Sequence, residues 1–366
     1  MPPWGWWPLA IVGCAMYANV AVHEGRRAPF RTAVWWALGW FVPSLAWMWF
    51  LTVPGYLIVC VLFAAFHGVA ATVAHLIGRV SDAHHRTALA LTHTFAEVLR
   101  LSFPFGGVPL ATLAISQSQS PFAHFAGVGG VILVTFMVLW FSFSDRRIRV
   151  AVAGAVVLLV SLPFDTTTPV GDATYALVQG GGAQGTHVGD VDPRDVFLAH
   201  IAATRTINKD TALTAVVWPE NVINITGNGA FTNSRELTEI AVESRRLGVP
   251  FVVGITEDAG DNSFTNAQVV VQPDGSVTDR YDKKRRVPFG EYMPMRSLLG
   301  SLGAPVDLVP RDAVPGTTPG FVDVAGTRMS VAISWEIFFG GRVNEGVAEG
   351  GRIIVNPTNE IGRAHV

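Results

Sequence analysis

Residues 328–339 read RMSVAISWEIFF. The mostly apolar and small side chains of residues 328–333 predict a buried strand that ends at Ser334. The carboxylate of Glu336 follows two residues later. A nucleophile at the end of a core strand sits on a rigid support with its tip free to meet substrate. We therefore expect any chemistry of this chain at Ser334, where the serine hydroxyl needs strong activation by other residues.

Composition divides the chain into two parts. Its 366 residues are 50% hydrophobic and only 15% charged, whereas soluble domains carry about 25% charged residues. Residues 1–165 are nearly all apolar, which predicts a helical membrane domain there and a soluble domain over 166–359. The net charge of −2 offers no basic surface for nucleic acid. Cys14 and Cys60 lie in separate apolar stretches and indicate neither a disulfide framework nor a zinc site.

The apolar part contains six segments that are candidates for membrane spans, which need about 20 residues each. They cover residues 7–23, 32–51, 55–78, 87–103, 122–143 and 148–164. Arginines lie after the first, third and fifth segments, whereas the alternate loops contain no lysine or arginine. By the positive-inside rule the arginine-bearing loops are cytoplasmic. About six crossings then place the chain from residue 165 onward on the outer side of the membrane.

Two charged residues of the fourth segment, Glu97 and Arg100, are three positions apart and share one face of a helix. One interpretation is an ion pair near the outer end of the segment. The other is a polar wall of a site for a lipid headgroup, because ionisable residues inside a membrane are costly and often functional.

The second part of the chain alternates between predicted strands and helices. Strands are expected at 173–179, 214–218, 250–256, 265–272, 320–324, 328–333 and 352–356, and a further strand runs into Tyr281 after a turn at 273–276. Helices are expected at 192–207, 232–247 and 341–349, and a long loop at 282–318. This alternation predicts the α/β class.

Three points in this part carry groups suited to chemistry. Glu220 ends a strand after Pro219, Lys283 and Lys284 lie in the run YDKKRRVPFGEY over residues 281–292, and Ser334 ends another strand. A carboxylate that accepts the nucleophile's proton and an ammonium that stabilises an oxyanion would suit acyl transfer. The alternatives are a solvated strand end at the glutamate, and a solvated loop or a lipid-phosphate patch at the basic run.

Several motifs resemble those of bacterial apolipoprotein N-acyltransferases, which are membrane members of the nitrilase (carbon–nitrogen hydrolase) superfamily. In order and spacing, the similar stretches are VWPE at 217–220, YDK at 281–283, VPFGEY at 287–292 and ISWE at 333–336. The stretch PWGWWPLA at 3–10 and the region of Glu97, Arg100 and FPF at 103–105 also resemble the membrane part of that family.

The resemblance implies an α-β-β-α sandwich on a multi-pass helical domain in the bacterial inner membrane, with the sandwich on the periplasmic or outer side. It implies a ping-pong reaction in which a cysteine takes an acyl chain from a phospholipid as a thioester. The acyl chain then passes to the α-amino group of the S-diacylglyceryl-cysteine of a lipoprotein. The implied partners are therefore phospholipid, lipoprotein and membrane; no metal, other cofactor or nucleic acid is implied.

The motifs also imply roles for individual residues. Glu220 matches the general base, Lys283 the oxyanion lysine and Ser334 the position of the nucleophile. The supporting positions are Glu291, Glu336, Tyr281, Trp218 and Trp335. Substrate-binding positions are expected at Glu97, Arg100 and Asn359.

The nucleophile position departs from the family, which has cysteine there. A cysteine thiol with a pKa near 8.5 forms a thiolate far more readily than serine forms an alkoxide, and an ester reacts less readily with an amine than a thioester does. An alternative is therefore a catalytically inactive homologue that binds membrane lipid or lipoprotein or supports a partner protein. A further alternative is an amidase that acts on a small amide. The retained Glu220, Lys283, Glu291 and Glu336 favour the acyltransferase.

Both ends of the chain also differ from the family pattern. The family usually has another hydrophobic helix before the stretch at 3–10. The stretch VNPTN at 355–359 resembles a strand end of the family, and the tail EIGRAHV at 360–366 matches nothing in it. That tail can be back-translated into a common sequencing adapter, so we expect a truncated hydrolase domain with a non-native tail.

Overall fold

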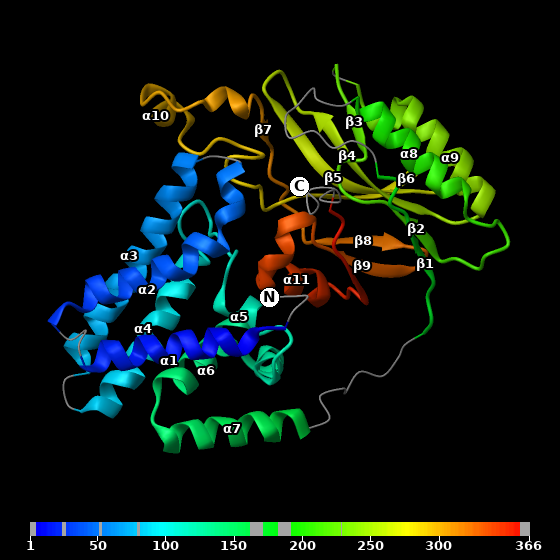
Figure 1. The fold of residues 1–366 in the computed structure, drawn as a ribbon. Coiled ribbons are helices and arrows are strands. Elements are labelled where there is room, and N and C mark those ends of the chain that lie inside the picture. Colours follow the sequence, from blue (N-terminus) through cyan, green and yellow to red (C-terminus); the bar gives the residue numbers. More distant parts are fainter. Residues whose placement is uncertain are drawn as a thin grey trace. The chain divides into compact units, whose positions relative to one another are not determined.

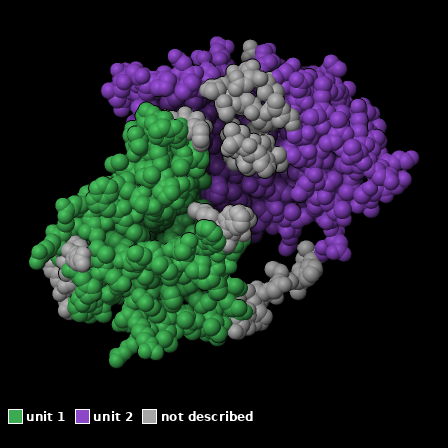
Figure 2. Space-filling view, viewed as in Figure 1, with its two compact units in different colours: residues 1–168 green, residues 169–366 purple. Residues whose placement is uncertain are grey.

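The computed structural model describes residues 5–23, 27–50, 53–78, 81–161, 171–181, 192–227 and 229–358 (Figure 1). The chain forms two compact units, residues 1–168 and residues 169–366, which are coloured separately in Figure 2. Asn359 and the expected tail at 360–366 lie outside the described residues.

The first unit is helical. Its α-helices are α1 (Trp7–His23), α2 (Pro29–Ser44), α3 (Val53–Ile77), α4 (Asp82–Arg100), α5 (Leu113–Ser116), α6 (Ala126–Phe143) and α7 (Arg146–Ser161). The 3₁₀ helices η2 (Ala46–Phe50) and η3 (Pro121–Phe125) precede α3 and α6. Helix α4 begins earlier than the apolar pattern predicts because the Ser81 hydroxyl caps it by accepting a hydrogen bond from the His84 amide.

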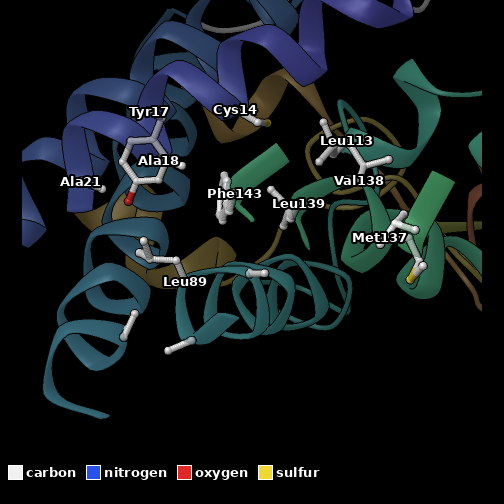
Figure 3. Packing of buried hydrophobic residues seen from close by; sticks show 14 of the residues in the cluster. Cys14, Tyr17, Ala18, Ala21, Leu89, Leu113, Met137, Val138, Leu139 and Phe143 are labelled. Carbon is white, nitrogen blue, oxygen red and sulfur yellow. The ribbon is translucent and has the colours of Figure 1, made fainter. Parts of the chain in front are cut away.

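Side chains from α1, α4 and α6 meet in the core of this unit (Figure 3). The rings of Tyr17 and Phe143 lie 5.8 Å apart, and Leu89 packs in the same cluster. Small residues such as Ala18 let the helix backbones approach closely.

Two helical stretches of the described residues, Val53–Ile77 and Pro121–Phe143, are long and apolar enough to cross a membrane. Helix α1 is apolar but shorter. Each of the six apolar segments overlaps one of the longer helices, but helix formation does not test insertion. The expectation of about six crossings therefore stays a prediction.

The described residues of the second unit form two β-sheets. The first has the order β1 (Tyr175–Leu177), β2 (Ala215–Val217), β4 (Phe251–Asp258), β5 (Ser263–Val271) and β6 (Val277–Asp282), with β3 (Ile223–Ile225) on β4 and β7 (Asp312–Ala313) on β5. The second has the order β10 (Ile353–Val355), β9 (Thr327–Val331) and β8 (Phe321–Val324). The helices are α8 (Pro193–Arg205), α9 (Arg235–Leu247), α10 (Arg296–Ser301) and α11 (Gly340–Ala348), with 3₁₀ turns η4 (Phe231–Asn233), η5 (Val306–Leu308) and η6 (Ser334–Phe338).

The alternation of side chains along the strands sorts them into layers. Phe251 and Val253 of β4 pack in one cluster with Phe197 of α8, whereas Val252 packs in another with Met329 of β9. Helix α11 covers the far face of the second sheet, where a Cβ on Gly346 would overlap the Ser330 side chain. The layers are therefore helix, sheet, sheet and helix (Figure 1), and the nitrilase-like α/β class expected for this part is confirmed.

The expected 282–318 loop differs from the structure, because it contains α10, η5 and the short strand β7. Strand β3 was also not predicted, since three residues are too few to show an alternating pattern.

Candidate active site

The Glu220 turn follows strand β2. Trp218 is fully buried, its amide donates to the carbonyl of Val252, and its indole Nε1 donates to Thr204 Oγ1 at 3.1 Å. The turn that holds Glu220 packs directly against β4, because a Cβ at Gly254 would be 2.7 Å from the Glu220 Cα. These contacts hold Glu220, which is only 3% exposed, at the end of the first sheet.

Lys283 directly follows β6 and lies between two carboxylates. Its Nζ donates to Glu220 Oε1 at 2.8 Å and to Glu291 Oε1 at 2.7 Å, and the residue is 2% exposed. Asn266 of β5 donates from Nδ2 to the same two oxygens, at 2.7 Å to Glu220 and 3.1 Å to Glu291. Asn266 was not predicted as a site residue from the sequence. The sequence signal that could have indicated it is a polar residue within a predicted strand. These four side chains form one hydrogen-bonded cluster, which we call the carboxylate–lysine cluster.

The cluster holds its charges in a largely buried environment. Burial alone would lower the pKa of Lys283, but the carboxylates of Glu220 and Glu291 outweigh it and hold that pKa above the usual value. Burial raises the pKa of Glu291, and the nearby Glu220 carboxylate adds to this rise against the opposing effect of Lys283. Lys283 is therefore an ammonium at neutral pH, which is the form that can stabilise an oxyanion.

Ser334 lies on a strained turn after β9. Its φ is 51°, in the left-handed region that costs a residue with a side chain of order 1–3 kcal/mol. The Ser334 amide donates to the carbonyl of Pro357, and Asn356 Nδ2 donates to the Ser334 carbonyl, both at 2.8 Å. The turn is therefore fixed from the β10 side, and its half-buried side chain lies at the tip of a strand–turn–helix elbow.

The fully buried carboxylate of Glu336 joins this elbow to the segment after Lys283. It accepts from the Ile333 amide at 2.9 Å and from the Lys284 and Arg285 amides, each at 2.9 Å. The Tyr281 hydroxyl also donates to both of its oxygens at 2.9 Å. Burial, followed by the Glu336 carboxylate, raises the pKa of Tyr281, so its hydroxyl remains a donor.

The structure thus assembles the expected residues of the second unit into two linked groups. Glu220, Lys283 and Glu291 share hydrogen bonds, and Glu336 with Tyr281 ties the adjacent segment to Ser334. Trp335 adds a second tie, since its Nε1 donates to the Arg285 carbonyl at 2.8 Å. Within the described ranges, no hydrogen bond joins the Ser334 hydroxyl to the carboxylate–lysine cluster, and no group of three or more His, Cys, Asp and Glu side chains could hold a metal ion.

Nucleophilic acyl transfer needs a nucleophile, a general base and a group that stabilises the oxyanion. The hydroxyl on the strained elbow, the carboxylate and the ammonium can fill these three roles. Residues 177–366 match the family of carbon-nitrogen hydrolases, and this match covers more than half of the chain. The chain belongs to the carbon-nitrogen hydrolase family. Residues 1–144 match the apolipoprotein N-acyltransferase N-terminal domain.

Two relatives align with this chain over both its helical part and its hydrolase part. The apolipoprotein N-acyltransferase of Mycolicibacterium smegmatis is 27% identical, over 98% of this chain and 67% of its own length. That of Pasteurella multocida is 25% identical, over 96% of this chain and 74% of its own length. A solved amidase of the nitrilase superfamily from Nesterenkonia AN1 has 16% identity and a TM-score of 0.36, over 52% of this chain and 66% of the amidase. The resemblance to apolipoprotein N-acyltransferases stated from the sequence is confirmed.

Glu97 and Arg100 lie in the first unit, within the part that matches the N-terminal domain. Arg100 donates to Glu97 from Nε at 3.0 Å and from Nη2 at 2.6 Å, and both residues are buried. The Arg100 guanidinium also donates to the carbonyl of Val108 at 3.2 Å, and His67 Nε2 lies 3.4 Å from Glu97 Oε1. These contacts agree with the ion-pair interpretation, and a role of the pair in substrate binding stays a prediction.

Proposed function

We propose that the chain is an apolipoprotein N-acyltransferase that forms its acyl-enzyme on Ser334. It transfers a fatty acyl chain from a phospholipid to the α-amino group of the S-diacylglyceryl-cysteine of a lipoprotein. The observation that carries this proposal is the buried ammonium of Lys283 between two carboxylates, tied through Glu336 to a strained serine elbow. The names of the relatives supply the class of substrate.

In the first half-reaction, Glu220 accepts the proton of the Ser334 hydroxyl as its oxygen attacks the ester carbonyl of the phospholipid. The Lys283 ammonium stabilises the oxyanion of the tetrahedral intermediate. When the intermediate collapses, the bond to the glycerol oxygen breaks. Glu220 returns the proton to that oxygen, and a lysophospholipid leaves.

In the second half-reaction, the neutral α-amine of the lipoprotein attacks the acyl-serine carbonyl and loses one proton to Glu220. Collapse of the second intermediate forms the amide and breaks the bond to the serine oxygen. Glu220 then returns the proton to the Ser334 oxygen, which restores the starting enzyme. Glu291, Asn266 and Glu336 keep the base, the ammonium and the elbow in place.

Serine in place of cysteine changes the relative rates of the two half-reactions. The first half exchanges one oxygen ester for another, so it proceeds without the cost of making a thioester. The second half must open an oxygen ester with an amine, and this step is slower than with a thioester. Acyl-serine therefore accumulates when the acceptor is scarce, which gives burst kinetics.

We also propose that the helical part over 1–165 crosses the inner membrane about six times and holds the hydrolase part, 166–359, on the outer side. The two apolar helices and the placement of the arginines support this arrangement. Protease added to intact spheroplasts is expected to cleave the hydrolase part, and full protection would contradict the proposed orientation.

The experiment that tests the reaction uses the full chain in detergent with a labelled phospholipid and an S-diacylglyceryl peptide. Native chain and Ser334→Cys should acylate the peptide, the cysteine variant faster, and Ser334→Ala should not. If Ser334→Ala performs as well as the native chain, Ser334 is not the nucleophile.

A further inference from the structure

Three more cations follow Lys283 directly, and the proposed reaction leaves them without a role. Lys284 and Arg286 are half-buried and Arg285 is exposed. A run of basic residues at a membrane enzyme is either a solvated loop or a site for lipid phosphate. The contacts of each side chain distinguish these two interpretations.

Arg285 is fixed at three points by the elbow that carries Ser334. Its amide donates to Glu336 Oε1, and its carbonyl accepts from Trp335 Nε1. Its guanidinium carbon lies 4.8 Å from the centre of the Phe339 ring. A solvated loop would not need to hold both backbone groups and the side chain of one arginine. The guanidinium is therefore placed by the residues that place the nucleophile.

The neighbouring cations have different partners. Lys284 Nζ lies 3.6 Å from Glu345 Oε1 on α11. Arg286 donates to the Ala313 carbonyl at 2.9 Å and stacks over the Tyr292 ring at 4.2 Å. Among the contacts between described residues, the Arg285 side chain thus packs on the elbow segment, whereas those of Lys284 and Arg286 contact other segments.

We propose that the Arg285 guanidinium binds the phosphodiester of the phospholipid donor while Ser334 attacks the donor's ester carbonyl. This inference rests on the proposed function. In a glycerophospholipid only the glycerol separates that ester from the phosphodiester, so a cation beside the elbow suits a donor whose ester reaches Ser334. A guanidinium offers paired N–H donors in the geometry that phosphate oxygens accept.

Packing on Phe339 strengthens this assignment. An arginine stacked on an aromatic ring is partly ordered before the ligand arrives, so less side-chain freedom is lost on binding. Arg285 therefore selects phosphate-bearing acyl donors over esters that lack phosphate. It is a specificity residue for the first half-reaction and takes no part in bond making.

The test measures the rate of Ser334 acylation in detergent with two donors, a phosphatidylglycerol and a diacylglycerol with the same chains. For Arg285→Gln we expect kcat/KM with the phospholipid to fall about 10- to 100-fold, the range of a lost charge-assisted hydrogen bond. The diacylglycerol rate should stay within about twofold. Lys284→Gln is the matched control and should leave both rates unchanged.

The remaining outcomes separate the explanations. An equal fall with both donors would mean that Arg285 only supports the elbow, and unchanged rates would also overturn the assignment. If inorganic phosphate inhibits through Arg285 while the phospholipid rate is insensitive to Arg285→Gln, the site binds free phosphate and the proposal is wrong. If the native chain is acylated by neither donor, the proposed function itself fails, and this inference fails with it.

Discussion

Replacing Lys283 by methionine tests the carboxylate–lysine cluster in depth. The Nζ lies 2.8 Å and 2.7 Å from two carboxylate oxygens in a residue that is 2% exposed. Breaking a buried ion pair by removing one partner costs about 3–5 kcal/mol of stability. Loss of one oxyanion donor lowers the rate of the chemical step by about 10²–10³-fold, or about 2.7–4 kcal/mol. Both losses are expected in Lys283→Met.

A second variant separates the two effects. Lys283→Met with Glu220→Gln replaces one positive and one negative charge, so the cluster keeps the net charge of its native form. We expect this double variant to regain part of the lost stability, measured as Tm in detergent, and to remain inactive. The control is Lys284→Met, whose side chain is 40% exposed and 3.6 Å from its partner, and a change of at most about 1 kcal/mol is expected there. If Lys283→Met transfers acyl chains at the native rate, the assigned oxyanion role is wrong.

Three further predictions follow from the same geometry. Asn266→Ala removes the donor shared by Glu220 and Glu291, so acylation should fall about tenfold with a Tm loss equivalent to about 1–3 kcal/mol; native rates would contradict the positioning role. Gly254→Ala places a Cβ 2.7 Å from the Glu220 Cα, and we expect a loss of about 1–3 kcal/mol and most of the activity, whereas a fully active variant would show that the turn can move freely. Burial alone would lower the pKa of Lys283, but Glu220 and Glu291 raise it above 10.5. Its stabilising effect is therefore complete below the unfolded pKa of about 10.4 and is lost only as the pH rises through the raised folded pKa. The difference in Tm between native chain and Lys283→Met should thus stay constant from about pH 7 to about pH 9, and a steady decline over that range would contradict it.

Several parts of the hydrolase unit could be predicted from the sequence. The apolar runs at 214–218 and 250–256 coincide with β2 and with most of β4, because a run of buried apolar residues has a clear composition. Glu220, Lys283 and Glu291 were found from motifs, and the structure brings them together since each motif follows the end of a strand or lies in the adjacent loop.

Other features depend on contacts between segments that are distant in sequence, so they could not be predicted from any short stretch of the chain. Asn266 joins the cluster because β5 pairs with both β4 and β6, and a single asparagine in a strand carries no sign of that. Gly254 lies in the middle of β4, and its need for a hydrogen in place of a side chain comes from a turn more than thirty residues earlier in the chain. The link from Glu336 to the Lys284 and Arg285 amides likewise joins segments that are distant in sequence.

In the helical unit, the sequence located the apolar segments but left Glu97 and Arg100 with two interpretations. The structure adds the carbonyl of Val108 and the ring of His67 as their partners. Both partners come from outside the α4 turn that holds the pair, so spacing along the helix could not reveal them.

The central claim is that Ser334 carries the acyl chain, and intact-mass measurement tests it most directly. The full chain is incubated in detergent with phospholipid and no acceptor, and the acylated peptide is mapped. We predict one added acyl group on the peptide that contains Ser334, stable to neutral hydroxylamine as an oxygen ester is, and none on Ser334→Ala. An acyl group that persists on Ser334→Ala, or a native chain that gains none, would contradict the account.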